Sequence, residues 1–185
     1  MLNAIAVSLV DHDPAWAGLA AAHGAQLQVL GDLLVRVHHI GSTAIPGLIA
    51  KPIIDLLPVV ASIEALDRER WRIEALGYEY HGEYGVPGRR FFSLPGAGTR
   101  LVHVHFFETG SDQIRHNLAF RDYIRAHPDV AAAYAREKRR ARDLHPDDSH
   151  GYAAEKAAWV LATAADARAW FARQPASPDL QTVAD

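Results

Sequence analysis

The stretch KPIIDLLPVV, residues 51–60, constrains the fold of this chain more than any other. It is a nearly continuous apolar run with several β-branched residues, which is typical of a strand that is buried on both faces. Such a strand needs cover on both sides of its sheet. One acidic residue, Asp55, interrupts the run. A carboxylate away from water is costly unless it is paired or holds a metal, so Asp55 indicates either a structural ion pair or a site.

The spacing of apolar residues predicts an α/β (α+β) fold with a mixed sheet. Up to residue 108 the order of elements is αβαβαβββ, in which the last three strands form a β-meander. We expect a core over residues 1–110, a three-helix C-terminal extension of the same domain over 111–173, and a disordered tail over 174–185. The expected core elements are helices over 14–30 and 62–76, strands over 33–40 and 51–60, and a turn with a short helix over 42–50.

The composition limits the classes of function. The chain has 185 residues, a formal net charge of -3 and no cysteine. Without a basic surplus we expect no general nucleic-acid binding and no membrane binding, and a small molecule is the favoured partner. Without cysteine, a metal has to be held by His, Asp or Glu. The sequence shows no secretion signal and no apolar run of about 20 residues, so we expect a cytoplasmic protein.

Polar residues around the apolar strand are candidates for a site. Gly41 and Ser42 follow a predicted strand and precede a helix, where backbone N–H groups would face a phosphate. The alternative is a tight turn that Ser42 or Thr43 caps. Asp55 could hold a hard cation such as magnesium. The alternative for Asp55 is an ion pair with an arginine on a neighbouring strand, for which the candidates are Arg36, Arg90 and Arg100.

Two histidines and several cations complete the candidates. In the segment LVHVHFFE, His103 and His105 share one face of the predicted strand and could bind a metal or flank a phosphate, although a chance pair is an equal alternative. Lys51, Arg89, Arg90 and Arg100 could neutralise phosphate charge, or could be solvated strand ends. The basic helical segment REKRRAR, residues 136–142, is interpreted as a solvated helix face.

Several motifs together resemble the GrpB family of the nucleotidyltransferase-like superfamily, over about residues 5–172. The resemblance rests on HHIGSTAIPGLIAKPIIDLLPVV, GYEYHGEYGVPGRRFF, HVHFFE, FRDYIRAHP, AAAYAREKRRAR and YAAEKAAWV. It implies a nucleotidyltransferase-like fold of the polymerase-β type, which has a mixed β-sheet with flanking helices, here followed by a C-terminal helical extension. Relatives of this family also occur fused to dephospho-coenzyme A kinase.

The superfamily pattern has a Gly-Ser pair and then Asp-x-Asp or Asp-x-Glu on the next strand. Here twelve residues separate Ser42 from Asp55, a separation that the resemblance allows. The resemblance therefore implies Asp55 as the catalytic, metal-binding carboxylate and Gly41, Ser42 and Thr43 as a phosphate loop. Leu57 stands where a second acid is expected, and His103 and His105 stand on the strand where a third carboxylate would be sought.

These residues predict a nucleotidyltransferase-like protein that binds a nucleotide or other phosphorylated small molecule with a divalent metal. The metal is Mg, Mn or Zn, held by Asp55, His103 and His105, and the candidate activity is transfer of a nucleotidyl group. One aspartate and two histidines do not suit a two-metal mechanism, so a single, softer metal is favoured. The alternatives are a catalytically inactive ligand-binding or chaperone-like module for a protein partner, or a metal-dependent hydrolase.

Overall fold

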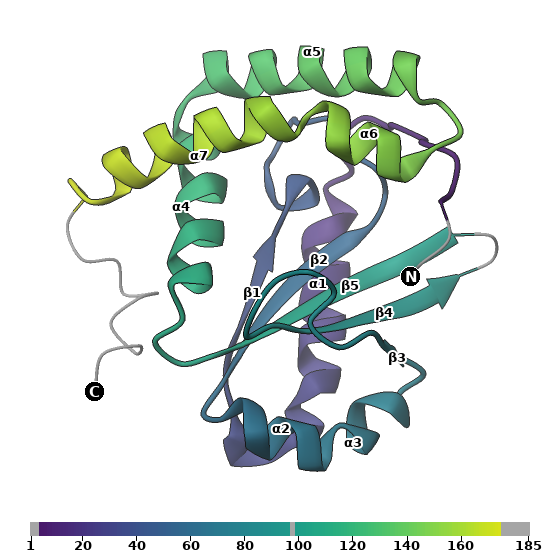
Figure 1. Cartoon of the computed structure of the whole chain (residues 1–185), viewed down its shortest axis with the longest axis vertical. Helices are drawn as coiled ribbons and strands as arrows, with labels where there is room; N and C mark the ends of the chain where they lie inside the picture. The colour runs from purple at the N-terminus through teal and green to yellow at the C-terminus, as the bar shows by residue number, and fades with distance from the viewer. Residues whose placement is uncertain (1–3, 97–98, 175–185) are drawn as a thin grey trace.

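The computed structural model describes residues 4–96 and 99–174, and it shows a five-stranded mixed sheet between helices (Figure 1). The strand order is β1-β2-β5-β4-β3. β2 pairs antiparallel with β1 and parallel with β5, whereas β5, β4 and β3 form the predicted antiparallel meander. The prediction of a mixed sheet is thereby confirmed. The strands are β1 Leu34–Ile40, β2 Ile54–Val60, β3 Glu79–Tyr80, β4 Arg90–Gly96 and β5 Thr99–Glu108.

One face of the sheet carries the main hydrophobic core. Alternate residues of β2 and β5, among them Leu56, Val104 and Phe106, point to this face and pack against Trp16 and Leu27. The helix predicted over residues 14–30 begins close to its expected start, but it ends earlier and continues as 3-10 turns. The elements around this core are α1 Ala15–Gln26, η1 Leu27–Leu33, α2 Ile63–Glu69 and α3 Trp71–Glu74.

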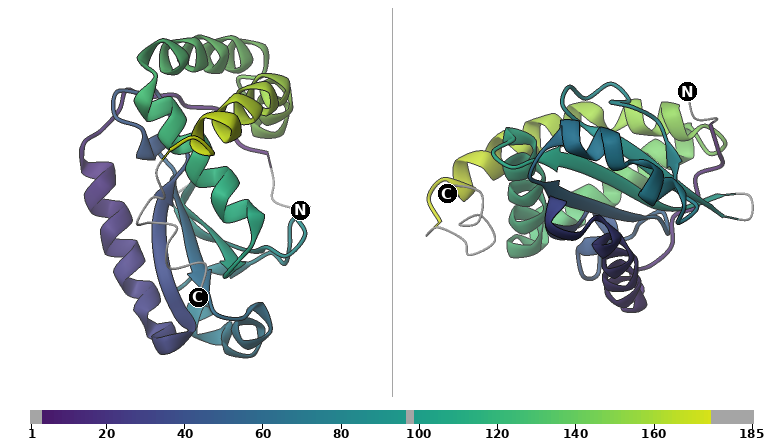
Figure 2. Two further views of the ribbon diagram at one scale, coloured as in Figure 1. Left: turned by 90° about the vertical axis from the view of Figure 1, so that its left-hand side faces the viewer. Right: turned by 90° about the horizontal axis from the view of Figure 1, so that it is seen from below.

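The opposite face of the sheet is only partly covered by helix. Leu57 of β2 and Phe107 of β5 pack against Ile114 and Leu118 of α4, so β2 is buried on both faces as predicted. Figure 2 shows α1 and α4 on opposite sides of the sheet, with α5 across the top. The predicted third C-terminal helix is two helices that meet at Lys156. The C-terminal helices are α4 Asp112–Ala126, α5 Pro128–Leu144, α6 Ser149–Glu155 and α7 Ala157–Phe171.

The C-terminal helices join the sheet through a second apolar cluster. Ile45 and Leu48, in the segment between β1 and β2, pack with Ile124 of α4 and Tyr134 of α5.

None of the helices in the two described ranges is both long and apolar enough to cross a lipid bilayer. Except for residue 174, the tail predicted over 174–185 lies outside the described residues. The division into a core and an extension stays a prediction.

Candidate metal and anion site

Three groups that could hold a metal meet on the partly open face of the sheet. The β2–β5 register places Asp55 opposite His103, and strand alternation returns His105 to the same face. Oδ1 of Asp55 lies 3.4 Å from Nδ1 of His103 and 3.3 Å from Nε2 of His105. One ligand atom of each residue lies within 4.8 Å of the other two. The side chains are 26%, 20% and 18% exposed, so solvent reaches them.

Burial and hydrogen bonding have opposite effects on the pKa of Asp55. Burial raises the pKa of Asp55, but hydrogen bonds from His103 and His105, and the charges of these rings when they are protonated, outweigh burial and hold that pKa below its usual range. Burial lowers the pKa of His105, although Asp55 pulls it upward. An anionic carboxylate beside an imidazole that resists protonation is a suitable state for metal binding.

Arg89 contacts this cluster from the segment before β4. Its Nη1 lies 3.2 Å from Nδ1 of His105, and its Nε and Nη2 donate to the carbonyl oxygens of Glu83 and Tyr84. A guanidinium only donates, so Nδ1 of His105 accepts and a neutral ring has its proton on Nε2, toward Asp55. If Nε2 bound a metal, the proton would move to Nδ1 and face Arg89. Arg89 therefore opposes metal binding by His105.

Gly41 lies directly against the carboxylate of Asp55. The β1–β2 register pairs Ile40 with Asp55, which brings the following glycine next to the acid. A Cβ atom on Gly41 would collide with Oδ2 of Asp55. Its φ of 70° and ψ of -169° also belong to a region that is essentially restricted to glycine. Glycine is therefore required here for both conformation and space.

The turn after Gly41 differs from the predicted phosphate loop. It is one turn of 3-10 helix, η2 Ser42–Ala44, which is too short to act as a helix N-terminus for an anion. Thr43 is buried, and its hydroxyl donates to the carbonyl of Ile53. Because that hydrogen is used, Nε2 of His39, 3.0 Å away, donates to the same oxygen. The Thr43 side chain thus connects the turn by a hydrogen bond to the segment before β2. The side chain of Ser42 is half-buried.

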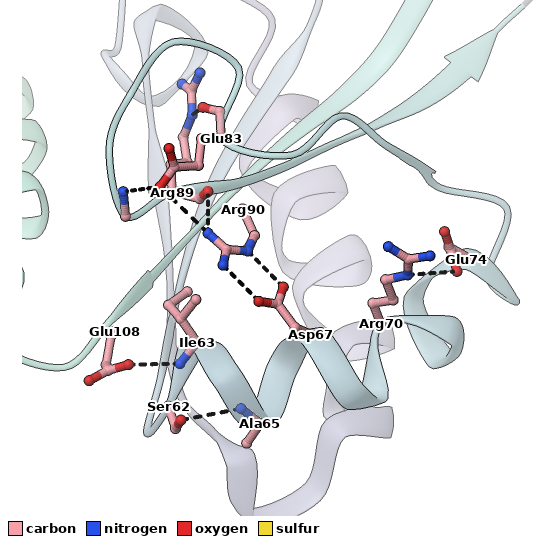
Figure 3. Close-up of polar contacts among 11 residues, drawn as sticks. Ser62, Ile63, Ala65, Asp67, Arg70, Glu74, Glu83, Arg89, Arg90 and Glu108 are labelled. Carbon is pink, nitrogen blue, oxygen red and sulfur yellow. Dashed lines mark hydrogen bonds and ion pairs between the residues drawn. The ribbon is translucent and has the colours of Figure 1, made fainter.

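Arg90, one of the predicted arginines, pairs with a carboxylate away from the cluster. Nε and Nη2 of Arg90 donate to the two carboxylate oxygens of Asp67 on α2, at 2.6 and 2.7 Å (Figure 3). This bidentate pair occupies the guanidinium of Arg90 and corrects the expectation that Arg90 pairs with Asp55, whereas phosphate binding by Arg90 stays a prediction. Arg100 lies in β5, but its side chain is outside the described residues. The ion-pair partners that Asp55 does have are His103 and His105.

The packing around position 57 accounts for the leucine that stands in place of the second carboxylate of the superfamily pattern. Its side chain is fully buried and packs with Phe107 of β5 and with Ile114 and Leu118 of α4. The face of β2 is therefore divided along its length: Asp55 lies at the open end, and α4 covers Leu57. A carboxylate at position 57 would be buried among aliphatic side chains instead of facing a metal.

A cavity of about 240 Å³ lies beside the cluster, and helices α5 and α6 form part of its wall. The predicted residues Gly41, Ser42, Thr43 and Lys51 line it together with Asp55 and His103. Four further lining residues with polar side chains come from the C-terminal helices and were missed by the sequence reasoning, which interpreted the segment around Lys138 as a solvated face. These residues are Tyr134, Lys138, Tyr152 and Lys156. A signal was present in the sequence, because the chain has only three lysines and all of them line this cavity.

Comparisons with known proteins agree with the resemblance found in the sequence. The family model described as GrpB protein matches residues 6–165. The UPF0157 protein YqkA of Bacillus subtilis is 39% identical over 165 residues, which cover 89% of this chain and 48% of YqkA. The chain thus spans about half the length of that relative.

Two solved structures share the fold. The crystal structure of the conserved protein GrpB from Enterococcus faecalis superposes with a TM-score of 0.85 at 36% identity, covering 90% of this chain and 100% of that one. The Cid1 poly(U) polymerase with Mg and 3′-dATP bound gives a TM-score of 0.50 at 13% identity, covering 76% of this chain and 45% of that one. The second likeness extends to the fold alone, and it confirms the predicted nucleotidyltransferase-like architecture.

Proposed function

This chain belongs to the GrpB family, and from that premise we propose that its cavity binds a nucleotide or another phosphorylated small molecule together with one divalent metal. The observation that carries this proposal is the convergence of Asp55, His103 and His105 within 4.8 Å of one another beside the cavity. The fold likeness to a polymerase that has Mg and a nucleotide bound gives further support.

The two separations between Asp55 and the histidines, together with the donor set, favour zinc over magnesium. Two ligands at about 2.0–2.1 Å from a tetrahedral zinc ion lie about 3.4 Å apart, whereas adjacent ligands of an octahedral magnesium ion lie about 2.9 Å apart. The separations of 3.3 and 3.4 Å around Asp55 agree with the tetrahedral value. Two imidazoles and one carboxylate are also a donor set that leaves a position open for a ligand.

Each residue has a distinct role in this proposal. Asp55, His103 and His105 would hold the metal, and Gly41 leaves room for the carboxylate of Asp55. The metal would supply polarisation of a phosphoryl oxygen. Ser42 would donate its hydroxyl to the ligand, and Lys51 would place positive charge beside it.

Binding without nucleotidyl transfer is the second candidate function, and Leu57 favours it. Two-metal transfer needs carboxylates that hold two cations, and the position that would supply the second one is occupied by a fully buried leucine. A relative that has lost transfer but retained the cavity would keep Asp55 and could tolerate Leu57.

Metal titration tests the proposal. We expect Zn²⁺ to bind with a stoichiometry of one in calorimetry, more tightly than Mn²⁺ or Mg²⁺. His103→Ala should weaken zinc binding at least tenfold, because one ligand of three is lost. His150→Ala is the matched control, since His150 is exposed on α6. Equal zinc binding by wild type and His103→Ala would refute the metal site.

A second assay separates the two candidate functions. The metal-loaded protein is incubated with nucleoside triphosphates, and both nucleotide binding and pyrophosphate release are measured. Binding with release that Asp55→Asn abolishes would support transfer. Binding without release, over a range of acceptors, would support the ligand-binding function.

A further inference from the structure

The lysines of this chain are confined to one place. The sequence contains three lysines and sixteen arginines, and all three lysines line the cavity beside Asp55. None of the arginines whose side chains the structure describes is among the lining residues. A chain that uses arginine almost everywhere else for positive charge has lysine at these positions only. This distribution indicates that the cavity requires the chemistry of an ammonium group.

The three ammonium groups alternate with two buried tyrosine rings. Nζ of Lys51 lies 5.4 Å from the ring centre of Tyr152, and Nζ of Lys156 lies 5.5 Å from the same ring. Lys156 is also 6.0 Å from the ring of Tyr134, and Nζ of Lys138 lies 4.9 Å from that second ring. The rings hold the cations in place by cation–π attraction without neutralising them. We call these five residues the lysine wall.

Lys138 is the most constrained member of the lysine wall. Its side chain is 3% exposed, and within the described residues neither Lys138 nor Lys156 forms an ion pair with a carboxylate. Burial, together with the charges of Lys156 and Lys51, lowers the pKa of Lys138 to about 7. A buried cation is costly unless an anion accompanies it. Asp55, which lines the same cavity, attracts Lys138 through its charge, but no described carboxylate forms an ion pair with Lys138, so a ligand is the natural source of a paired anion.

The chemistry of lysine indicates which anion fits. An ammonium group is a compact charge with three donors on a flexible stem, whereas a guanidinium presents a planar fork that suits one carboxylate or phosphate at a time. Several ammonium groups can distribute their donors over the oxygens of consecutive phosphates. A single phosphate could satisfy fewer of these donors.

We propose that the lysine wall binds a chain of at least two adjacent phosphate groups, so that the ligand of this cavity is a diphosphate or triphosphate compound. This inference rests on the proposed function, because it assigns the metal cluster and the lysine wall to the same ligand. The cavity supports the assignment, since Asp55 and His103 line it together with the three lysines.

The test uses metal-free protein, so that the lysine wall is measured separately from the metal site. Calorimetry in the presence of EDTA compares inorganic phosphate, pyrophosphate and tripolyphosphate. We expect the affinity to increase in that order, and Lys138→Met to weaken tripolyphosphate binding about tenfold through loss of a charge-assisted hydrogen bond. Arg139→Met is the matched control because Arg139 is the exposed neighbour on α5. Circular dichroism verifies folding, and Lys156→Met replaces Lys138→Met if that variant does not fold.

The outcomes separate this inference from the proposed function. If phosphate binds as tightly as tripolyphosphate, or if both lysine variants bind tripolyphosphate like wild type, the inference is overturned. Tripolyphosphate binding that depends on Lys138, in a protein that binds no zinc, would support the inference and refute only the metal site. ATP is measured beside tripolyphosphate: tighter binding of ATP identifies a nucleotide as the source of the phosphate chain, and equal binding identifies the phosphate chain alone.

Discussion

The carboxylate of Asp55 occupies the space that a side chain at position 41 would need. Gly41→Ala adds a Cβ that collides with Asp55 and forces a backbone conformation that alanine avoids. We expect it to lower the free energy of unfolding by about 1–3 kcal/mol and to weaken zinc binding. Urea denaturation and calorimetry measure the two effects. Gly18→Ala in α1 is the control and should be neutral or stabilising, because Gly18 has no heavy atom within 4 Å of an added Cβ.

Arg89 acts on the metal site through the tautomer of His105. Its Nη1 lies 3.2 Å from Nδ1 of His105, where a metal-binding ring would need its own proton. Arg89→Met removes both this opposing donor and a nearby positive charge. We expect it to tighten zinc binding on the order of tenfold, as measured by competition with a chelating dye. Weaker zinc binding in this variant would show that His105 does not bind the metal through Nε2.

Lys138 should make the stability of the unliganded protein depend on pH. Its pKa is about 7 in the folded protein and about 10.4 in an unfolded chain. Between these values the unfolded state binds more protons, so stability rises with pH. From pH 7 to pH 9 we expect Lys138 to contribute about 2 kcal/mol of increase in the free energy of unfolding, which Lys138→Met should remove. Urea denaturation at the two pH values tests this, and an unchanged pH dependence in the variant would contradict it.

At the scale of single elements, one face of β2 contributes both to the candidate metal site and to the hydrophobic core. Asp55 faces the cavity, and two residues later Leu57 is covered by α4. Leu57→Asp would restore the superfamily pattern in the sequence, but it would bury a charge among aliphatic side chains. We expect it to destabilise the protein by about 3 kcal/mol or more in thermal melts, whereas Leu57→Met should cost less than about 1.5 kcal/mol. A stable Leu57→Asp variant that binds two zinc ions would refute this interpretation.

The break between α6 and α7 is a second feature at this scale. The sequence predicts one helix because no Gly or Pro interrupts the pattern there. In the structure Lys156, with φ of -87° and ψ of -2°, ends α6, and its ammonium group lies near the rings of Tyr134 and Tyr152. Trp159, at the start of α7, stacks on Tyr134 at 4.7 Å between ring centres. Packing against Tyr134 thus accounts for a bend that local sequence signals do not show.

At the scale of the whole molecule, the sheet and the C-terminal helices form the cavity together. The metal cluster lies on the sheet, whereas Lys138 and Lys156 come from helices beyond residue 110. Without these helices, Leu57 and Phe107 would lose their cover. We expect a chain of residues 1–110 to aggregate or to unfold without a cooperative transition, and to bind no tripolyphosphate. Light scattering and thermal melts test this expectation, and a soluble, cooperatively folding fragment would show that the predicted core is independent.

Features that depend on local chain geometry were predictable from the sequence. Alternation along a strand is set by backbone geometry, and it correctly put His103 on the same face as His105. The continuous apolar run of β2 correctly predicted burial on both faces. Family membership also follows from motifs that lie within continuous segments of the chain.

Only the tertiary structure decided which of these faces meet. The β2–β5 register, which sets Asp55 opposite His103, depends on contacts between segments far apart in the sequence, so no local pattern determines it. For the same reason, the sequence did not distinguish Arg89 from Arg90, whereas the structure pairs Arg90 with Asp67 and brings Arg89 to His105. Helix packing likewise turned Lys138 inward, whereas Arg136, Arg139 and Arg140 of the same basic segment are exposed as predicted. Local geometry determined which residues share a face, and long-range packing determined what each face contacts.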